Sequence, residues 1–260
     1  MTTALIGYTG FVGSTLWNQM RFDEGYNSKN IGDMRNKHFS RVVCAGVSAV
    51  KWKANKNPLE DWVNIRKLMD VLATITVDEF VLISTVDVYK DPGAGLTELD
   101  DPNPARDNHP YGTHRLALEA YVTEIFPKTT IIRLPGLFGE GLKKNIIFDL
   151  LTDNQLSQVN LNGSFQWYDL KHLGSDIELA LSMQAPHTIR NIAPAPVSTR
   201  EIVNTLFPDK ISKLTATGNI PNYNFKTCFQ TSIPSYTYTA SEVLADLKIF
   251  VEKFKTMHNQ

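Results

Sequence analysis

The sequence predicts an α/β fold in which a doubly wound parallel sheet is followed by a small, mostly C-terminal lobe. Short apolar runs of strand length alternate with longer amphipathic runs through residues 1–140. This alternation is typical of a parallel sheet that is covered by helices on both faces. A glycine-rich turn directly follows the first apolar run, which is where such a fold begins its first helix.

Composition excludes several classes of protein. The 260 residues are 42% hydrophobic and carry a net charge of −1, which is ordinary for a globular chain with enough apolar material for a core. No basic run suggests nucleic acid, and no apolar window reaches membrane-spanning length. We therefore expect a cytoplasmic protein with no nucleic-acid or membrane partner. Cys44 lies in an apolar run and is expected to be a buried, reduced thiol, and nothing predicts a metal site.

The elements of the first half follow from apolar spacing. Runs at 3–7, 41–47, 79–85 and 129–139 read as buried strands, and the last breaks at Pro135. A further short strand is expected to end near residues 27–29. Helical spacing covers 11–20, 61–75 and 111–126, where Pro110 suits the first turn of the third helix.

The second half is less regular. Residues 145–151, 200–207 and 241–255 read as helices, and 188–193 can return one strand to the sheet. The stretch 213–239 is polar and irregular, with prolines at 221 and 234. We expect one domain from residues 1–140 and 172–194, and a smaller lobe from residues 141–171 and 195–260.

Three glycines follow the first predicted strand at a spacing of three residues. Gly7 permits the tight turn, Gly10 lets a pyrophosphate approach the backbone, and Gly13 lets helix and strand pack closely. The helix that begins here offers free N–H groups and the positive end of its dipole. Because the strand–turn–helix context is met, we expect a dinucleotide site rather than a merely tight turn.

A tyrosine and an arginine stand four residues apart at the start of the helix predicted over 111–126. Tyr111 and Arg115 therefore share one face. A cation beside a phenol lowers its pKa and makes it a usable acid or base. The alternative is a surface helix in which Arg115 pairs with Glu119, and His114 is expected to be a helix-surface residue.

The stretches "TGFVGSTL", "STVDVY", "YGTHR" and "RLPGLFG", in this order, resemble the extended (atypical) short-chain dehydrogenases/reductases of the NAD-dependent epimerase/dehydratase family. This family contains nucleotide-sugar epimerases, dehydratases and reductases. The likeness covers residues 1–140 and continues more faintly through "WYDLKHLGSDI" and "RNIAPAPVSTREI". It implies a Rossmann sheet with a substrate lobe, and a possible homodimer formed through two helices, one of them at 111–126.

The resemblance also implies the cofactor contacts. The residues concerned are Gly7, Thr9, Gly10, Phe11, Val12, Gly13, Asn27, Ser28, Lys29, Cys44, Ala45, Gly46, Val47, Asn64, Ser84, Tyr111, Arg115, Leu134, Pro135 and Gly136. An NAD site usually has a carboxylate at the end of the second strand, and none stands there before Asp33. Lys29 can accept a 2′-phosphate, which favours NADP over NAD. The alternative is that Lys29 is solvated and Asn27 alone meets the ribose.

In the family, a threonine or serine holds the substrate oxygen, a tyrosine exchanges a proton with it, and a lysine lowers the tyrosine pKa and binds the nicotinamide ribose. Thr85 and Tyr111 match the first two, and Arg115 stands where the lysine belongs. Arginine keeps the positive charge, but its planar fork directs its donors differently from a lysine. We therefore expect Arg115 to belong to the site, while its donor geometry argues against full redox activity.

Five residues are expected to meet the substrate: Thr85, Asp87, Asn145, Trp167 and Tyr168. Asp87 can act as a base or bind a sugar hydroxyl, or it can simply form a turn. Val86 fills the position of the acid in family dehydratases, so a dehydratase is not expected. The family's diphosphate arginine is matched by Ser164 or Phe165, and Asn145 can take part of its role. Trp167 and Tyr168 can stack on a ring or belong to the core.

Two hypotheses follow from these residues. The first is an NAD(P)-dependent epimerase or reductase that acts on a sugar-like, possibly nucleotide-linked, alcohol or ketone by hydride transfer. The second is a dinucleotide-binding protein without redox turnover, which serves as a sensor or scaffold. The arginine at 115 favours the second hypothesis, and the presence of Tyr111 and Thr85 favours the first.

Overall fold

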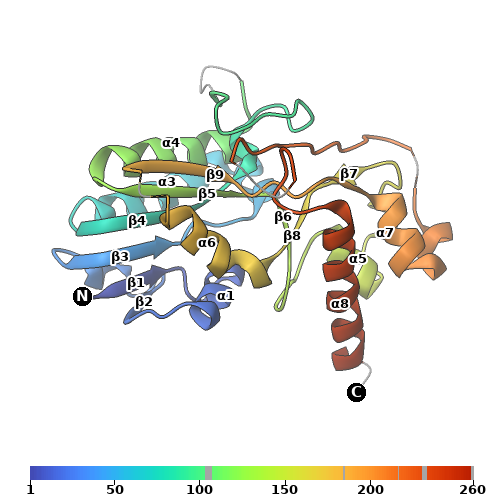
Figure 1. Ribbon diagram of the computed structural model, residues 1–260, viewed down its shortest axis with the longest axis horizontal. Helices are drawn as coiled ribbons and strands as arrows, with labels where there is room; N and C mark the ends of the chain where they lie inside the picture. The colour runs from blue at the N-terminus through green and yellow to red at the C-terminus, as the bar shows by residue number, and fades with distance from the viewer. Residues whose placement is uncertain (103–106, 184, 216, 230–232, 259–260) are drawn as a thin grey trace. The chain divides into compact units, whose positions relative to one another are not determined.

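The computed structural model describes residues 1–102, 107–183, 185–215, 217–229 and 233–258 (Figure 1). It divides into two compact units. The first contains Met1–Asp91, Asp100–Leu134 and Lys171–Asn191, and the second contains Pro92–Leu99, Pro135–Leu170 and Ile192–Gln260. These bounds differ from the domains expected from the sequence, chiefly because Pro92–Leu99 belongs to the second unit. Two backbone hydrogen bonds tie this segment to residues 224–226: Asn224 N–H donates to the Pro92 carbonyl and Lys226 N–H to the Leu96 carbonyl.

A parallel sheet forms the centre of the first unit. Within the described residues it has six strands, in the order β2-β1-β3-β4-β5-β9. Their bounds are β1 Thr3–Ile6, β2 Glu24–Tyr26, β3 His38–Cys44, β4 Thr76–Thr85, β5 Thr129–Leu134 and β9 His187–Asn191. All five pairings between neighbouring strands are parallel. The doubly wound α/β prediction is confirmed, and the strand expected at 188–193 does return to the sheet as β9.

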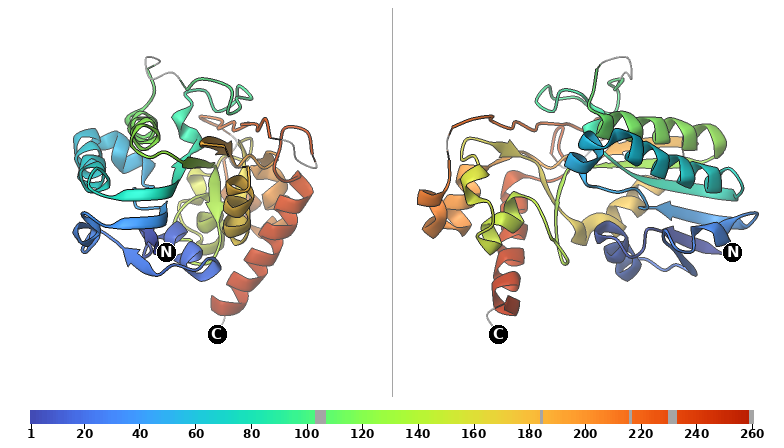
Figure 2. Two further views of the ribbon diagram at one scale, coloured as in Figure 1. Left: turned by 60° about the vertical axis from the view of Figure 1, so that its left-hand side comes forward. Right: turned by 180° about the vertical axis from the view of Figure 1, so that it is seen from behind.

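Helices cover both faces of this sheet (Figures 1 and 2). Helices α3 (Pro58–Leu72) and α4 (Pro110–Ile125) pack on each other over one face, and α1 (Phe11–Gln19) packs with α6 (Leu173–Leu181) over the other. Every residue of β5 is buried, as expected for a strand with helices on both sides. Stacked rings of Phe80 and Phe126, 4.5 Å apart, tie α4's end to the sheet.

Two helices of the first unit were missed from the sequence. Helix α2 (Lys51–Lys56) buries only Ala54. Its sequence therefore has no repeated apolar spacing from which a helix could be predicted. Helix α6 lies in a stretch for which only a family resemblance was noted. Among the described residues no helix has both the length and the apolar character needed to cross a membrane.

The second unit contains short strands and three of the predicted helices. Strand β6 (Gly136–Phe138) runs parallel to β8 (Trp167–Asp169), and β7 (Ser164–Phe165) pairs antiparallel with β10 (Val197–Ser198). The helices are α5 (Ile146–Thr152), α7 (Thr199–Leu206) and α8 (Ala240–His258). In the interior of this unit, the Phe138 ring lies 5.6 Å from that of Phe250 on α8. Single 3-10 turns occur at Ile31–Met34, Val86–Val88, Leu156–Gln158, Leu170–His172 and Pro208–Lys213.

Candidate active site

The glycine turn lies where the direction of winding reverses. Strand β1 has β2 on one side and β3 on the other, so the crevice at the carboxyl ends of β1 and β3 is the place where such sheets bind ligands. Gly7 leaves β1 with φ of +86°, and a Cβ on it would lie 2.4 Å from the Ala45 carbonyl oxygen after β3. Only glycine fits this close approach of two backbone segments.

Helix α1 begins directly beyond this turn. A Cβ on Gly13 would lie 1.9 Å from the Gly7 carbonyl oxygen, so helix and strand touch backbone to backbone. Gly10 differs, because a Cβ there would meet only that same oxygen, at 3.4 Å, and the residue is exposed. No side chain caps the helix at Gly10. The protein itself therefore does not require glycine at this position, and the open cradle beside free N–H groups fits a pyrophosphate.

The segment after β2 contains Asn27, Ser28 and Lys29, which the sequence predicts to lie at the cofactor ribose. Asn27 follows the strand and its side-chain oxygen accepts the backbone N–H of Lys29 at 2.9 Å. The backbone N–H of Asn27 donates to the Asn30 side chain at 2.7 Å. Ser28 and Lys29 are exposed. The turn is thus organised by Asn27 and Asn30, and it presents Lys29 to solvent.

The remaining predicted cofactor residues lie in different surroundings. Cys44 is fully buried, and burial raises its thiol pKa to about 11. Ala45, Gly46 and Val47 continue from it at the carboxyl end of β3, whereas Asn64 lies on the exposed side of α3. Leu134 ends β5 beside Thr85, and Pro135 and Gly136 already belong to the second unit.

Thr85, Asp87 and Tyr111 come together at the carboxyl end of β4. Thr85 is the last residue of this strand, and its hydroxyl oxygen accepts the backbone N–H of Asp87 at 3.1 Å. Tyr111 occupies the first turn of α4 and is buried, and the Thr85 side chain lies close enough to its phenol to lower the phenol pKa. Helix α4 is held close to this turn, since a Cβ on Gly112 would lie 2.2 Å from the Asp87 carbonyl oxygen.

Arg115 is buried behind the Tyr111 ring. Its guanidinium carbon lies 3.9 Å from the ring centroid. Two N–H groups reach both carboxylate oxygens of Asp61 on α3, at 2.5 and 2.9 Å. Others donate to the carbonyl oxygens of Ser48 and Tyr111, at 2.6 and 3.2 Å. The surface pairing of Arg115 with Glu119 is wrong, because the partner of Arg115 is Asp61.

The pKa of Tyr111 is shifted upward, whereas the sequence predicted that Arg115 would lower it. Burial raises its pKa above the ordinary value of 10.0. The charge of Arg115 acts in the opposite direction, as do the Thr85 side chain and Lys51, but they do not outweigh burial. Arg115 does lower the Tyr111 pKa, as expected. The net shift is nevertheless upward, because packing removes water from the phenol.

Two histidines flank this tyrosine on α4. His109 caps the helix, since its Nδ1 accepts the Gly112 N–H at 3.0 Å. His114 is not a freely exposed surface residue: its Nδ1 lies 2.8 Å from Asp61 Oδ2, and its ring packs 5.2 Å from that of Trp62. Both histidines therefore help to fix the start of α4.

A second buried ion pair lies below the tyrosine on the same helix. Glu119 is paired with Arg133 of β5 at 2.6 Å, and the Ser84 hydroxyl also donates to Glu119. Arg133 donates further to the Tyr89 hydroxyl at 2.6 Å. The Ser84 hydroxyl, expected to meet a cofactor, is therefore engaged inside the protein, and this network joins α4 to the strands that end at Thr85 and Leu134.

The substrate residues expected in the second unit have structural partners of their own. Asn145 caps α5 through the Phe148 N–H at 3.1 Å and donates to the Leu137 carbonyl oxygen at 2.8 Å. Trp167 and Tyr168 are buried, with 3% and 1% of their surface exposed, and the Tyr168 ring packs against Tyr238. This burial supports the alternative that the two residues belong to the core, and stacking of their rings on a substrate stays a prediction. Ser164 and Phe165 form β7, and no arginine stands in that strand.

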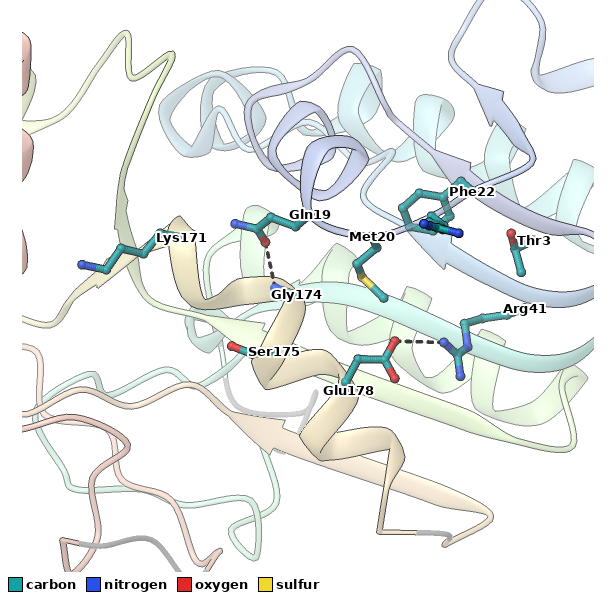
Figure 3. Close-up of a pocket in the computed structure, with 10 residues that line it drawn as sticks. Thr3, Gln19, Met20, Phe22, Arg41, Lys171, Gly174, Ser175 and Glu178 are labelled. Carbon is teal, nitrogen blue, oxygen red and sulfur yellow. Dashed lines mark hydrogen bonds and ion pairs between the residues drawn. The ribbon is translucent and has the colours of Figure 1, made fainter.

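A pocket of about 540 Å³ lies elsewhere in the first unit (Figure 3). It is lined by residues of β1, β3, α6 and the end of α1, among them Thr3, Gln19, Arg41 and Glu178. In it the Gln19 side chain accepts the Gly174 N–H at 2.8 Å, and Arg41 pairs with Glu178 at 3.0 Å. The glycine turn, Thr85 and Tyr111 do not line this pocket, so we assign the candidate site from their chemistry and position.

Three residues at the site were missed from the sequence. Lys51 of α2 lies with its Nζ 2.7 Å from Asp87 Oδ1, and Asn55, one turn later, accepts the Tyr111 N–H at 3.0 Å. Asp61 holds Arg115. Asp61 lies three positions after the proline that begins α3, and it offered no signal because its partner is 54 residues away along the chain.

A parallel sheet with a glycine turn at its switch point, together with a buried tyrosine and threonine at the carboxyl end of β4, defines a Rossmann-like α/β protein. The model of the NAD dependent epimerase/dehydratase family matches residues 4–173. The chain belongs to this family, which confirms the resemblance drawn from the sequence motifs. No protein of curated function matches the chain.

Solved structures share the fold at low sequence identity. The UDP-N-acetylglucosamine 4-epimerase of Methanobrevibacter ruminantium M1, in complex with UDP-N-acetylmuramic acid, is 14% identical with a TM-score of 0.72, and covers 98% of each chain. MoeE5 in complex with UDP-glucose and NAD is 18% identical, with a TM-score of 0.68 over 97% of this chain and 99% of that one. The dTDP-4-dehydrorhamnose reductase of Bacillus anthracis str. Ames in complex with NADP is 16% identical, with a TM-score of 0.66 over 98% of each.

Proposed function

We propose that the protein is an NAD(P)-dependent epimerase or reductase that acts on a sugar-like alcohol or ketone. The observation that carries this proposal is that the buried Tyr111 phenol and the Thr85 side chain lie together at the carboxyl end of β4. These two groups are the ones that a family enzyme needs on the reacting oxygen. Both lie in the unit that contains the glycine turn.

The roles of the residues follow from their contacts. Thr85 orients the substrate oxygen, and Tyr111 exchanges a proton with it. Arg115 holds the tyrosine ring from its buried side and does not reach the ligand, because both of its terminal nitrogens donate to Asp61, Ser48 and the backbone of Tyr111. The glycine turn and α1 hold the pyrophosphate, and the bound nicotinamide supplies the group that accepts or returns hydride.

Two finer assignments complete the proposal. NADP is preferred over NAD, because the exposed Lys29 stands where an NAD-specific site has a carboxylate. The substrate is linked to a nucleotide, as it is in the UDP-glucose and UDP-N-acetylmuramic acid complexes of the similar structures. The sequence offers no diphosphate arginine at β7, so the contact to such a diphosphate comes from a different residue.

The experiment combines binding with turnover. Calorimetry measures the affinity for NADP and NAD, and absorbance of the reduced nicotinamide follows turnover on a panel of nucleotide-linked keto-sugars. Tyr111→Phe is expected to bind the dinucleotide normally and to lose turnover. Tyr121→Phe is the matched control, since it removes a phenol from the same helix that donates only to the Met69 carbonyl oxygen. Full activity of Tyr111→Phe would remove the tyrosine from the mechanism.

A second candidate is a dinucleotide-binding protein without redox turnover. The observation that favours it is the commitment of Arg115 to Asp61, together with the raised pKa of Tyr111. Under this alternative, wild-type protein binds the dinucleotide and leaves its redox state unchanged with every keto-sugar. Under this alternative, Arg115→Lys shows no turnover either. A higher rate in Arg115→Lys than in wild type would mean that the arginine slows an existing reaction.

A further inference from the structure

The cation that the site presents to solvent is not Arg115. The Arg115 side chain is only 5% exposed and is enclosed by Asp61 and two carbonyl oxygens. Lys51 is different, because 36% of its side chain is exposed and its Nζ lies 2.7 Å from Asp87 Oδ1. Asp87 in turn is fixed to Thr85 through its backbone N–H.

Helix α2 fixes Lys51 relative to the tyrosine. Asn55, four residues after Lys51, lies one turn further along this helix and accepts the Tyr111 backbone N–H at 3.0 Å. Lys51 and Asn55 thus reach the turn after β4 and the start of α4 from the same short element. This arrangement places an ammonium and a carboxylate by the start of α4, near enough to the Tyr111 phenol for both charges to act on its pKa.

We propose that the Lys51–Asp87 ion pair belongs to the Tyr111–Thr85 site, and that Lys51 is a positioning residue whose charge neutralises Asp87 beside the phenol. Without this neutralisation the carboxylate opposes loss of the Tyr111 proton, since like charges disfavour one another. The proposal rests on the proposed function only for the role of Tyr111 in proton exchange. It gives Lys51 the electrostatic part of the role that a helix lysine has in the family.

The electrostatics of the surroundings agree with the geometry. Asp87 raises the pKa of Tyr111, and Lys51 lowers it, although burial and Arg115 act more strongly than either. Lys51 also acts on His109, whose pKa is lowered first by burial and then by this charge. The charged and titratable groups around the phenol are Lys51 of α2, Asp87 after β4, His109, His114 and Arg115 of α4, and Asp61 of α3.

The test reads the proton on Tyr111 directly and needs no ligand. Protein is produced with 3-fluorotyrosine, whose fluorine lowers the phenol pKa so that titration occurs while Lys51 is still charged. The ¹⁹F signal of Tyr111 is assigned by its loss in Tyr111→Phe. With Lys51→Met, the ionised fraction of Tyr111 at a fixed pH below its pKa is expected to fall by about threefold to tenfold, as for one nearby, partly screened charge.

Matched variants separate this effect from general disturbance. Lys53→Met removes an ammonium from the same helix, where it pairs with Glu60 at the surface, and is expected to leave Tyr111 unchanged. Asp87→Asn is expected to raise the ionised fraction of Tyr111. Combining Asp87→Asn with Lys51→Met is expected to return this fraction toward the wild-type value. Lys51→Arg keeps the positive charge and is expected to give the wild-type fraction. If Lys51→Met is too unstable to titrate, Asp87→Asn decides alone.

Two results would overturn the proposal: a Tyr111 titration in Lys51→Met equal to that in Lys53→Met, or no rise of the ionised fraction in Asp87→Asn. Turnover separates this question from the proposed function. In Lys51→Met, kcat is expected to fall about tenfold for each pKa unit gained by the phenol. A shifted Tyr111 titration together with full turnover of Tyr111→Phe would retain the ion pair's effect and reject the proposed reaction.

Discussion

Arg115 and Asp61 form a two-pronged ion pair, with N···O distances of 2.5 and 2.9 Å, between the helix that holds the candidate tyrosine and the helix beside it. Both side chains are at least nine-tenths buried. The pair therefore fixes α4 against α3 and holds the guanidinium against the Tyr111 ring. Arg115 is thus part of the protein's interior rather than a surface residue of α4.

Breaking this ion pair is expected to destabilise the protein. Asp61→Asn leaves a buried guanidinium without its counter-charge, which costs about 3–5 kcal/mol. Glu60→Gln, on the neighbouring position of α3, removes an exposed pairing with Lys53 and is expected to cost less than about 1 kcal/mol. Urea unfolding of the three proteins measures both values. Equal stability of the two variants would show that the Asp61 contact contributes nothing.

The glycine turn permits a separation of binding from folding. Gly10→Ala is expected to fold with near wild-type stability, because its Cβ meets only one oxygen at 3.4 Å, and to lose dinucleotide affinity. Gly13→Ala is expected to lose about 1–3 kcal/mol or more of stability, since its Cβ would lie 1.9 Å from the Gly7 carbonyl oxygen. Thermal unfolding and calorimetry with NADP check the two outcomes. Normal affinity of Gly10→Ala would contradict the phosphate cradle.

The cap of α4 predicts a pH dependence of stability. Burial and the nearby Lys51 hold the pKa of His109 below its ordinary value of 6.5, so the folded protein favours the neutral ring that accepts the Gly112 N–H. The contribution of the His109 cap to the free energy of unfolding is therefore complete above pH 6.5, and it declines as the pH falls below that value. Near neutral pH, His109→Ala is expected to cost about 1 kcal/mol.

His109→Asn keeps an acceptor that does not titrate, and its stability is therefore expected to fall less than that of wild type on going from neutral to mildly acidic pH. Urea midpoints of both proteins at the two pH values give the comparison. Parallel losses would mean that the histidine does not control this part of the pH profile.

The residue after β2 predicts the choice of dinucleotide. If Lys29 receives a 2′-phosphate, Lys29→Ser weakens NADP by about tenfold, the scale of one hydrogen bond to a charged group, and leaves NAD unchanged. Calorimetry with both dinucleotides measures the ratio, and the NAD affinity is the internal control. An unchanged ratio would mean that Lys29 is solvated and that Asn27 alone serves the ribose.

Much of the fold was determined by the sequence alone. Strands β1, β3, β4 and β5 each contain a short apolar run, and the glycines at 7, 10 and 13 mark the turn between β1 and α1. Such signals are local, because a buried strand or a tight turn imposes its requirement on neighbouring residues. The spacing that places Tyr111 and Arg115 on one face of α4 is also a local signal.

Tertiary structure decided the partners and the electrostatics. Sequence spacing could not show that Arg115 turns to Asp61 and Glu119 to Arg133, or that α2 brings Lys51 to Asp87, because these partners meet only when distant segments pack. The direction of the Tyr111 pKa depends on how much water packing removes, which no spacing encodes. Burial of Trp167 and Tyr168 was settled in the same way. The sequence alone determined which groups are present and along which local elements, and the packing determined which charges face one another.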